Sequence, residues 1–225
     1  MKRITIAIDG PAASGKSTTA ARVAAALGYQ HLNSGLLYRA ITWAAFVGSW
    51  PPDPDSFAES LEALDIELER SGLGFRVKVG GVDPGEDLVS QETSAHVSEV
   101  SARPCVRDRV LGLLRGEGRC GGIVCDGRDI GTVVFPEAEL KIFLVASAEE
   151  RGRRRLLDLG FEATREAVEG EARRLAARDE ADSGRAIAPL RQAEDAVRLD
   201  TTSLSADEVV GRIVQLARQR TSAVG

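Results

Sequence analysis

The sequence predicts an α/β protein in which a mainly parallel sheet is covered by helices on both faces. Short apolar runs that are typical of buried strands alternate along the chain with segments of helical periodicity. The first of these runs leads into a glycine-rich segment and then into a helix. The chain has 225 residues, of which 43% are hydrophobic, and this is enough to bury one sizeable core.

Four apolar runs are predicted to be buried strands, at residues 4–8, 122–126, 140–145 and 196–200. Helices are predicted after three of them. The first ends near Gly28, a typical C-cap, and the second spans about 148–159. The last follows the capping sequence at 205–208. Residues 221–225 are predicted to form a disordered tail.

The middle of the chain interrupts this alternation. From Ile66 to Val79, apolar residues alternate with charged or small ones, and nearby glycines supply turns. We therefore predict a small antiparallel meander at about 65–89, inserted into the α/β domain. Residues 90–102 and 104–115 are predicted to be helices, with Pro104 in a first helical turn.

Composition argues against several classes of function. A formal net charge of −5 disfavours a general nucleic-acid-binding protein. No apolar stretch approaches the roughly 18 residues of a membrane span, and the one after residue 3 is too short for a signal peptide. Cys105, Cys120 and Cys125 form no CxxC pair and lack histidines at metal-ligand spacing. We expect a cytoplasmic protein with reduced cysteines.

The segment Gly10-Pro-Ala-Ala-Ser-Gly-Lys-Ser17 fits the phosphate-loop pattern GxxxxGK[ST], and it lies between a predicted strand and a predicted helix. Backbone amides of such a loop converge on phosphate oxygens, and the helix N-terminus adds positive potential. Lys16 is predicted to reach the β- and γ-phosphates, and Ser17 to hold Mg²⁺. A chance match is the alternative, which the context makes rare.

The loop alone does not name the reaction, because many nucleotide-binding enzymes share it. The only asparagine, Asn33, is followed by Ser34, so the guanine-reading NKxD motif of GTPases is absent.

Asp126 ends a predicted strand, where this fold places a carboxylate that holds Mg²⁺ directly or through water. The alternative is a turn residue, because Asp-Gly is a common turn dipeptide. Arg128 can clamp a phosphate bidentately, and Asp129 could orient it or contact a base. A surface ion pair is the alternative for these two residues.

Arg178, Asp182 and Arg185 are spaced four and three apart, so a continuing helix would place them on one face. With the arginines at 151, 153, 154 and 155 they suggest a lid that closes over a nucleotide and excludes water. The alternative is a solvated basic surface with local salt bridges.

Together these segments resemble the bacterial cytidylate kinase family over nearly the whole chain. The resemblance is carried by residues 8–17, 33–39, 126–136, 178–179 and 185–190. It implies a P-loop nucleoside-monophosphate kinase fold with a parallel five-stranded core sheet, an insertion that binds the nucleoside monophosphate, and a short lid. The implied organisation is a single kinase domain, with core segments 1–37, 104–150 and 186–225, the insertion at 38–103 and the lid at 151–185.

The implied activity is transfer of the γ-phosphoryl group of ATP to CMP or dCMP by a monomer, with Mg²⁺ as cofactor. The residues implied to be catalytic are Lys16, Asp126, Arg128 and Arg178. Those implied to bind ATP are Gly10, Pro11, Ala12, Ala13, Ser14, Gly15, Lys16, Ser17, Thr18 and Arg154. Those implied to bind CMP are Ser34, Tyr38, Arg39, Ser98, Arg107, Arg128, Asp129, Arg178, Asp182 and Arg185.

Within that set, Ser98, Arg107 and Asp129 are similar to the family's readers of the cytosine edge, whose donors and acceptors such side chains can match. Asp182 and Arg185 resemble the pair on the ribose side. The chain departs from the family pattern at Asn33, where many relatives carry aspartate, and at Ala181, where some carry arginine or tyrosine.

Two other functions remain open at this point. A shikimate-type kinase shares the loop and the size, but needs neither the inserted meander nor the 126–129 segment. A non-catalytic nucleotide sensor would bind nucleotides without turnover.

Overall fold

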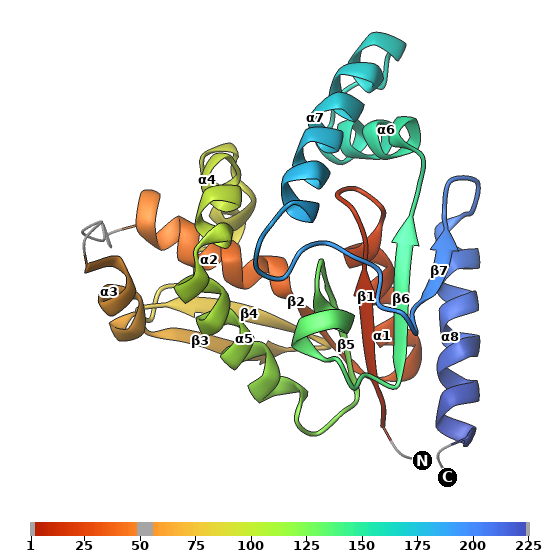
Figure 1. Cartoon of the computed structure of the whole chain (residues 1–225), viewed down its shortest axis with the longest axis horizontal. Coiled ribbons are helices and arrows are strands. Elements are labelled where there is room, and N and C mark those ends of the chain that lie inside the picture. Colours follow the sequence, from red (N-terminus) through yellow and green to blue (C-terminus); the bar gives the residue numbers. More distant parts are fainter. Residues whose placement is uncertain (1–2, 49–55, 224–225) are drawn as a thin grey trace.

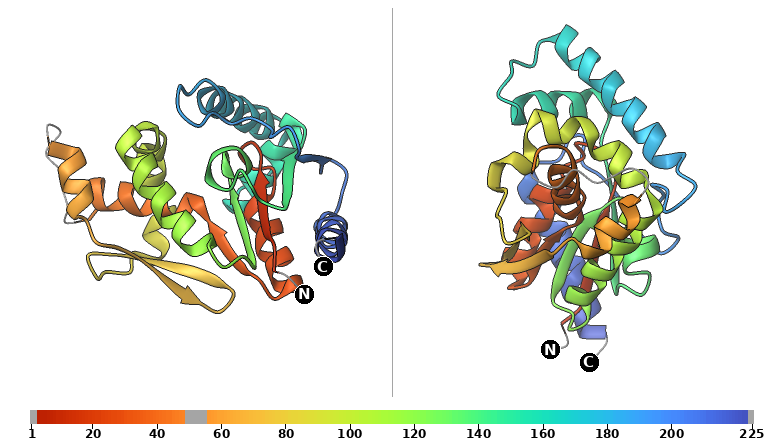
Figure 2. Two further views of the ribbon diagram at one scale, coloured as in Figure 1. Left: turned by 60° about the horizontal axis from the view of Figure 1, so that its bottom comes forward. Right: turned by 90° about the vertical axis from the view of Figure 1, so that its left-hand side faces the viewer.

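A computed structural model of the chain describes residues 3–48 and 56–223 and has an α/β architecture (Figures 1 and 2). Its central sheet has five strands in the order β2-β5-β1-β6-β7, and every neighbouring pair is parallel. The strands are β1 (Thr5–Asp9), β2 (Gln30–Asn33), β5 (Ile123–Gly127), β6 (Leu140–Val145) and β7 (Val197–Asp200). The expected parallel five-stranded core is confirmed.

Alternate residues of the strands contribute to two apolar cores, one on each face of the sheet. Ile6 and Ile8 of β1 belong to the core beneath α1 (Lys16–Leu27) and α8 (Ala206–Ala223). Ala7, between them, belongs to the core beneath α2 (Ser34–Phe46) and α5 (Pro104–Gly118). Because both faces are buried, the central strands are continuously apolar, which is why the sequence revealed them.

The edge strand β2 had no such signal. Of its four residues only Leu32 is fully buried, and the others are polar and half-buried. It is defined by its pairing with β5, which brings Asn33 beside Asp126.

The inserted region is an antiparallel hairpin rather than a longer meander. Its strands are β3 (Ile66–Ser71) and β4 (Gly74–Val79), and residues Gly85–Val89 form the 3₁₀ helix η2. The tip of the hairpin is tied to β2, because the His31 amide donates to the Leu73 carbonyl over 2.6 Å. The flanking helices are α3 (Phe57–Ala63), which was not predicted, and α4 (Gln91–Ala102), which was.

Helices α6 (Ala148–Asp158) and α7 (Arg165–Ser183) pack together beyond the carboxyl end of the sheet (Figure 1). Gly152 permits this close packing, because a Cβ there would lie 2.7 Å from the Val168 carbonyl oxygen. Helix α7 ends at Ser183, so the prediction that one helix carries Arg178, Asp182 and Arg185 is wrong for Arg185.

The chain's last described residues also differ from expectation. Helix α8 continues to Ala223, so residues 221–223 are helical and not a disordered tail, whereas 224 and 225 lie outside the described residues. In the described part of the chain, no helix combines the length and the apolar character that crossing a bilayer requires.

Candidate active site

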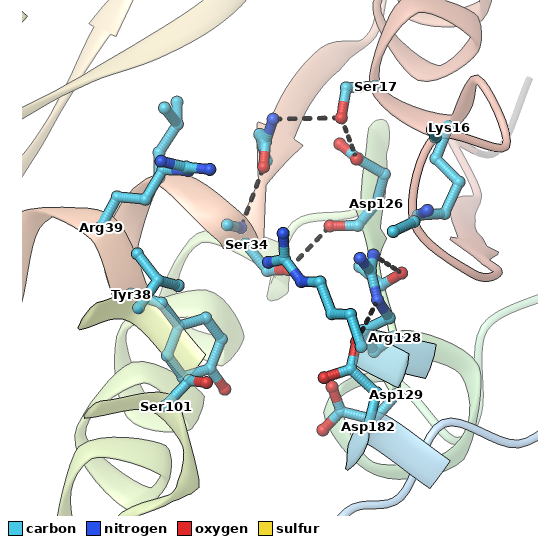
Figure 3. A pocket seen from close by; sticks show the side chains of 18 of the residues that line it. Lys16, Ser17, Ser34, Tyr38, Arg39, Ser101, Asp126, Arg128, Asp129 and Asp182 are labelled. Atoms are coloured by element: carbon cyan, nitrogen blue, oxygen red, sulfur yellow. Dashed lines mark hydrogen bonds and ion pairs between the residues drawn. The ribbon is translucent and has the colours of Figure 1, made fainter. Parts of the chain in front are cut away.

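A cavity of about 330 Å³ opens at the carboxyl end of the sheet and gathers residues from the glycine loop, α2, the end of β5, and α7. In Figure 3, Lys16 and Ser17 lie on one side of it and Tyr38 and Arg39 on the other, with Asp126 and Arg128 between them. The predicted site residues that line it are Ala12, Ala13, Gly15, Lys16, Ser17, Thr18, Ser34, Tyr38, Arg39, Arg107, Asp126, Arg128, Asp129, Arg178, Asp182 and Arg185.

The glycine loop has the geometry of an anion cradle. Gly10 packs so closely on β6 that a Cβ would lie 2.1 Å from the Leu144 carbonyl oxygen, and Gly15 has a φ of 87°. Within the described residues, the amides of Ala13, Gly15, Lys16, Ser17 and Thr18 have no protein acceptor. These donors are therefore available to phosphate oxygens.

Lys16 is held inside this loop. Its Nζ donates to the Pro11 carbonyl over 2.6 Å and to Ser14 Oγ over 3.3 Å, so Pro11 and Ser14 support the lysine without lining the cavity. Burial and the neighbouring Arg128 hold the pKa of Lys16 well below its usual value of 10.5. A polyanion beside the ammonium would favour its charged form.

The Asp126 carboxylate faces the start of α1 and offers oxygen atoms that could ligate a metal ion. It accepts from Ser17 Oγ over 2.6 Å and lies 2.8 Å from His31 Nε2. Asn33 also donates to Ser17 Oγ, over 3.3 Å, and its own Oδ1 caps α2 by accepting from the Gly35 amide. The contact with Ser17 shows that Asp126 is more than a turn residue.

Asp9 supports the turn that follows β5. Its carboxyl oxygens accept from the amides of Ile130 and Gly131 over 2.8 and 2.7 Å, which begin the single π-helical turn η3 (Ile130–Val134). Burial raises the pKa of Asp9 to about 6 despite these two bonds. The arrangement fixes the backbone directly after Arg128 and Asp129.

A buried ion pair stands at the far end of the cavity. Arg107 donates to Asp129 over 2.7 Å, and the two side chains are only 6% and 7% exposed. Burial raises the pKa of Asp129, and the Arg107 charge opposes this. Tyr38 lies alongside, with its ring centroid 5.6 Å from the Arg107 guanidinium, and burial raises its pKa to about 12.

Ser98, expected beside this pair, is exposed on α4 and does not line the cavity. Ser101, one turn further along the same helix, does line it, and its carbonyl accepts from Arg107 over 3.2 Å. Ser101 shares a helix face with Val97, another lining residue, whereas Ser98 is turned by about 100° from that face.

Arginines from α2, β5 and α7 converge in the middle of the cavity. Arg128 and Arg185 both pair with the buried carboxylate of Asp182, over 2.9 and 2.5 Å. Arg178 makes no hydrogen bond or ion pair among the described residues, and its buried Nε is unsatisfied. Burial and Arg128 lower its pKa, and burial with Arg178 and Arg155 lowers that of Arg39.

The lining is strongly cationic in a chain that is acidic as a whole. Lys16 and six arginines face only four aspartates, whereas the chain carries a net charge of −5. Like charges held together at low exposure cost free energy that a bound anion recovers. The local salt bridges foreseen as the alternative do exist, but they leave this excess uncompensated.

Helix α6 carries the four arginines that the sequence assigned either to a lid or to a solvated basic surface. Arg155 lines the cavity, and Arg154 donates to the Thr201 carbonyl over 2.7 Å, beside Gly15 and outside the lining. Arg151 is buried against the glycine loop, so of the four arginines only Arg153 matches the predicted solvated surface. The four-residue spacing of Arg151 and Arg155 was the available signal.

Comparisons with known proteins agree with this geometry. The sequence model of the family described as cytidylate kinase matches residues 6–219. Proteins named cytidylate kinase from Geobacter sulfurreducens and Bacillus subtilis are each 44% identical to this chain; the alignments cover 96% and 97% of it, and 94% and 98% of those proteins. A crystal structure of an uncharacterized protein from Eubacterium ventriosum shares the fold, with a TM-score of 0.52 at 11% identity over 96% of this chain and 99% of that one. The chain belongs to the cytidylate kinase family.

Proposed function

We propose that this chain transfers the γ-phosphoryl group of ATP to CMP or dCMP, giving ADP and CDP or dCDP. The observation that carries the proposal is the single cationic cavity that runs from the amides of the glycine loop to the buried Arg107–Asp129 pair. A phosphate cradle at one end and a polar, base-sized recognition pair at the other suit two nucleotides bound head to tail.

The donor nucleotide is assigned to the loop side. The free amides of Ala13, Gly15 and residues 16–18, with the Lys16 side chain, hold the β- and γ-phosphates. Arg154 flanks the loop from α6 and is assigned to the same nucleotide. The acceptor phosphate is assigned to Arg39, Arg128 and Arg178, which line the same cavity as the loop.

Cytosine recognition is assigned to Arg107 and Asp129, with Ser101 beside them. A guanidinium donates to the ring nitrogen or carbonyl of cytosine, and a carboxylate accepts from its 4-amino group. Asp182 and Arg185 are assigned to the sugar side. No feature of this pair requires a 2′-hydroxyl, so dCMP is included as an acceptor.

Phosphoryl transfer needs little covalent help from side chains, because its barrier is lowered by positioning and by cations around the equatorial oxygens. Arg128, Arg178 and Arg155 line the same cavity and are assigned to supply these cations. Residues 151–185, which include most of α6 and all of α7, act as the lid that excludes water, and residues 38–103 carry the acceptor side.

Mg²⁺ suits the oxygen donors beside the loop. Ser17 Oγ and the Asp126 carboxylate face each other over 2.6 Å, and Mg²⁺ is usually held by one or two such groups together with phosphate oxygens and water. These two residues would hold the ion, Asp126 directly or through water, and the ion would neutralise charge on the transferred phosphoryl group. The three cysteines are unpaired, which fits a reducing cytosol.

A coupled assay of ADP release tests the proposal with CMP, dCMP, UMP and AMP as acceptors. We expect fast turnover with CMP and dCMP, and little with AMP. A clear preference for AMP would refute the substrate assignment.

The same assay separates the remaining alternatives. ADP release that depends on the acceptor excludes a non-catalytic sensor, whereas tight binding of both nucleotides without turnover would support one. Turnover with shikimate in place of a nucleotide would favour the other kinase class.

A further inference from the structure

Two side chains of the lid helices hold the two peptide groups that flank the Cα of Ala12 in the glycine loop. The Ala12 amide donates to Asp179 Oδ1 over 2.9 Å, and the Ala12 carbonyl accepts from Arg151 Nη1 over 3.1 Å. Arg151 and Asp179 also pair with each other, joining α6 to α7. The ion pair is only 10% and 16% exposed, so water screens it weakly.

These two peptide groups lie at a demanding point of the loop. The next residue, Ala13, has a φ of 57°, a conformation that is strained for a residue other than glycine unless its surroundings impose it. The Ala13 amide shares a peptide group with the Ala12 carbonyl and has no protein acceptor among the described residues. Fixing the peptide groups on both sides of Ala12 therefore helps to aim the phosphate-binding amides.

The same contact places Arg178, which directly precedes Asp179. No hydrogen bond or ion pair holds the Arg178 side chain among the described residues, so its placement depends on where α7 lies. That helix is held on one side by Asp179 at the glycine loop and on the other by Asp182 at Arg128.

We infer that Arg151 and Asp179 are positioning residues. They fix the position of α7, which carries Arg178, relative to the loop that holds the donor phosphates. This inference rests on the proposed function for the identity of the phosphates. Neither residue lines the cavity, so neither is assigned a contact with a substrate.

The test compares Asp179→Asn, Arg151→Gln and the double variant with a matched control. Glu169→Gln removes an exposed carboxylate of the same helix, whose ion-pair partner within residues 3–48 and 56–223 is Arg165. We expect kcat to fall by about 10- to 100-fold in each single variant, because a displacement of about 1 Å can cost that much. KM for CMP should change by less than about 3-fold, since Arg107 and Asp129 are untouched, and Glu169→Gln should match the wild type.

The double variant should be no slower than the slower single variant, because the pair acts as one unit. Kinetic effects in Asp179→Asn and Arg151→Gln equal to those of Glu169→Gln, or fully additive losses in the double variant, would overturn the inference. A thermal melt of each variant shows whether activity is lost because the protein unfolds. The double variant is less prone to unfold than the single variants, because it leaves no unpaired buried charge.

Amide hydrogen exchange separates this inference from the proposed function. The peptide containing Ala12 should exchange faster in Asp179→Asn than in Glu169→Gln, whatever the enzyme phosphorylates. A wild-type protein that fails to phosphorylate CMP would refute the proposed function alone, whereas unchanged exchange at Ala12 would refute the inference alone.

Discussion

Replacing Asp9 by asparagine removes a buried carboxyl that joins the end of β1 to the turn after β5. Asp9 is 4% exposed and accepts two backbone amides, yet burial raises its pKa from 3.8 to about 6. Such a shift corresponds to about 3 kcal/mol of free energy of unfolding between the two protonation limits. Ionisation of this carboxyl therefore lowers the free energy of unfolding.

The sign follows from the proton balance. Between the two pKa values the native state binds more protons than the unfolded state, so the stability due to Asp9 is complete below about pH 4 and falls as the pH rises through about 6. About 2 kcal/mol of the fall should lie between roughly pH 4.5 and 7.5. Asparagine cannot ionise, so the variant lacks this fall.

Urea denaturation of the wild type and Asp9→Asn, measured across that pH range, checks the prediction. Asparagine has one acceptor oxygen in place of two, which adds a loss of about 1–3 kcal/mol that does not vary with pH. Asp65→Asn, at an exposed position, supplies the background pH dependence. If the difference in stability between wild type and Asp9→Asn were constant with pH, the assigned cost of ionising Asp9 would be wrong.

Three further predictions concern the site and the lid. Lys16→Ala and Arg128→Ala should each abolish phosphoryl transfer. Both variants should melt close to the wild-type temperature, because neither residue belongs to the apolar core. If Arg128→Ala unfolds, the pair of Arg128 with Asp182 is mainly structural. Arg107→Ala should lower the free energy of unfolding by about 3–5 kcal/mol, because Asp129 is left buried without its partner. The variant should also have a smaller ratio of kcat/KM for CMP to kcat/KM for UMP. An unchanged ratio would contradict the assignment of Arg107 to base recognition. Gly152→Ala should destabilise the protein by about 1–3 kcal/mol in thermal or urea unfolding, because the added methyl group meets backbone atoms of α7 at 2.7 and 3.2 Å. An unchanged free energy of unfolding would mean that α6 and α7 can move apart at little cost in stability.

Much of the fold was predictable because its signals are local. The central strands are buried on both faces and so appear as apolar runs, and the glycine loop needs a fixed set of residue types. Strand β2 and helix α3 lacked such signals. The end of α7 before Arg185 was also missed, because charge spacing does not reveal where a helix stops.

The candidate site divides in the same way. Lys16, Ser17, Asp126 and Arg128 follow from the strand and loop pattern, and Arg107 and Asp129 followed from the family resemblance. Ser101 was missed, because which face of α4 meets the cavity is set by how that helix packs. Arg155 was placed in the predicted lid, but its position in the cavity lining likewise depends on how α6 packs.

The sequence by itself determined the chemistry available to this protein: a phosphate loop, a carboxylate after a buried strand, and an unusual supply of arginines. The tertiary structure alone decided which charges meet. Arg151 and Asp179, 28 residues apart, close on Ala12, and Asp9 reaches amides 121 and 122 residues away. Electrostatic and hydrogen-bonding free energies depend on distance and burial, and chain position fixes neither until the helices and strands have packed.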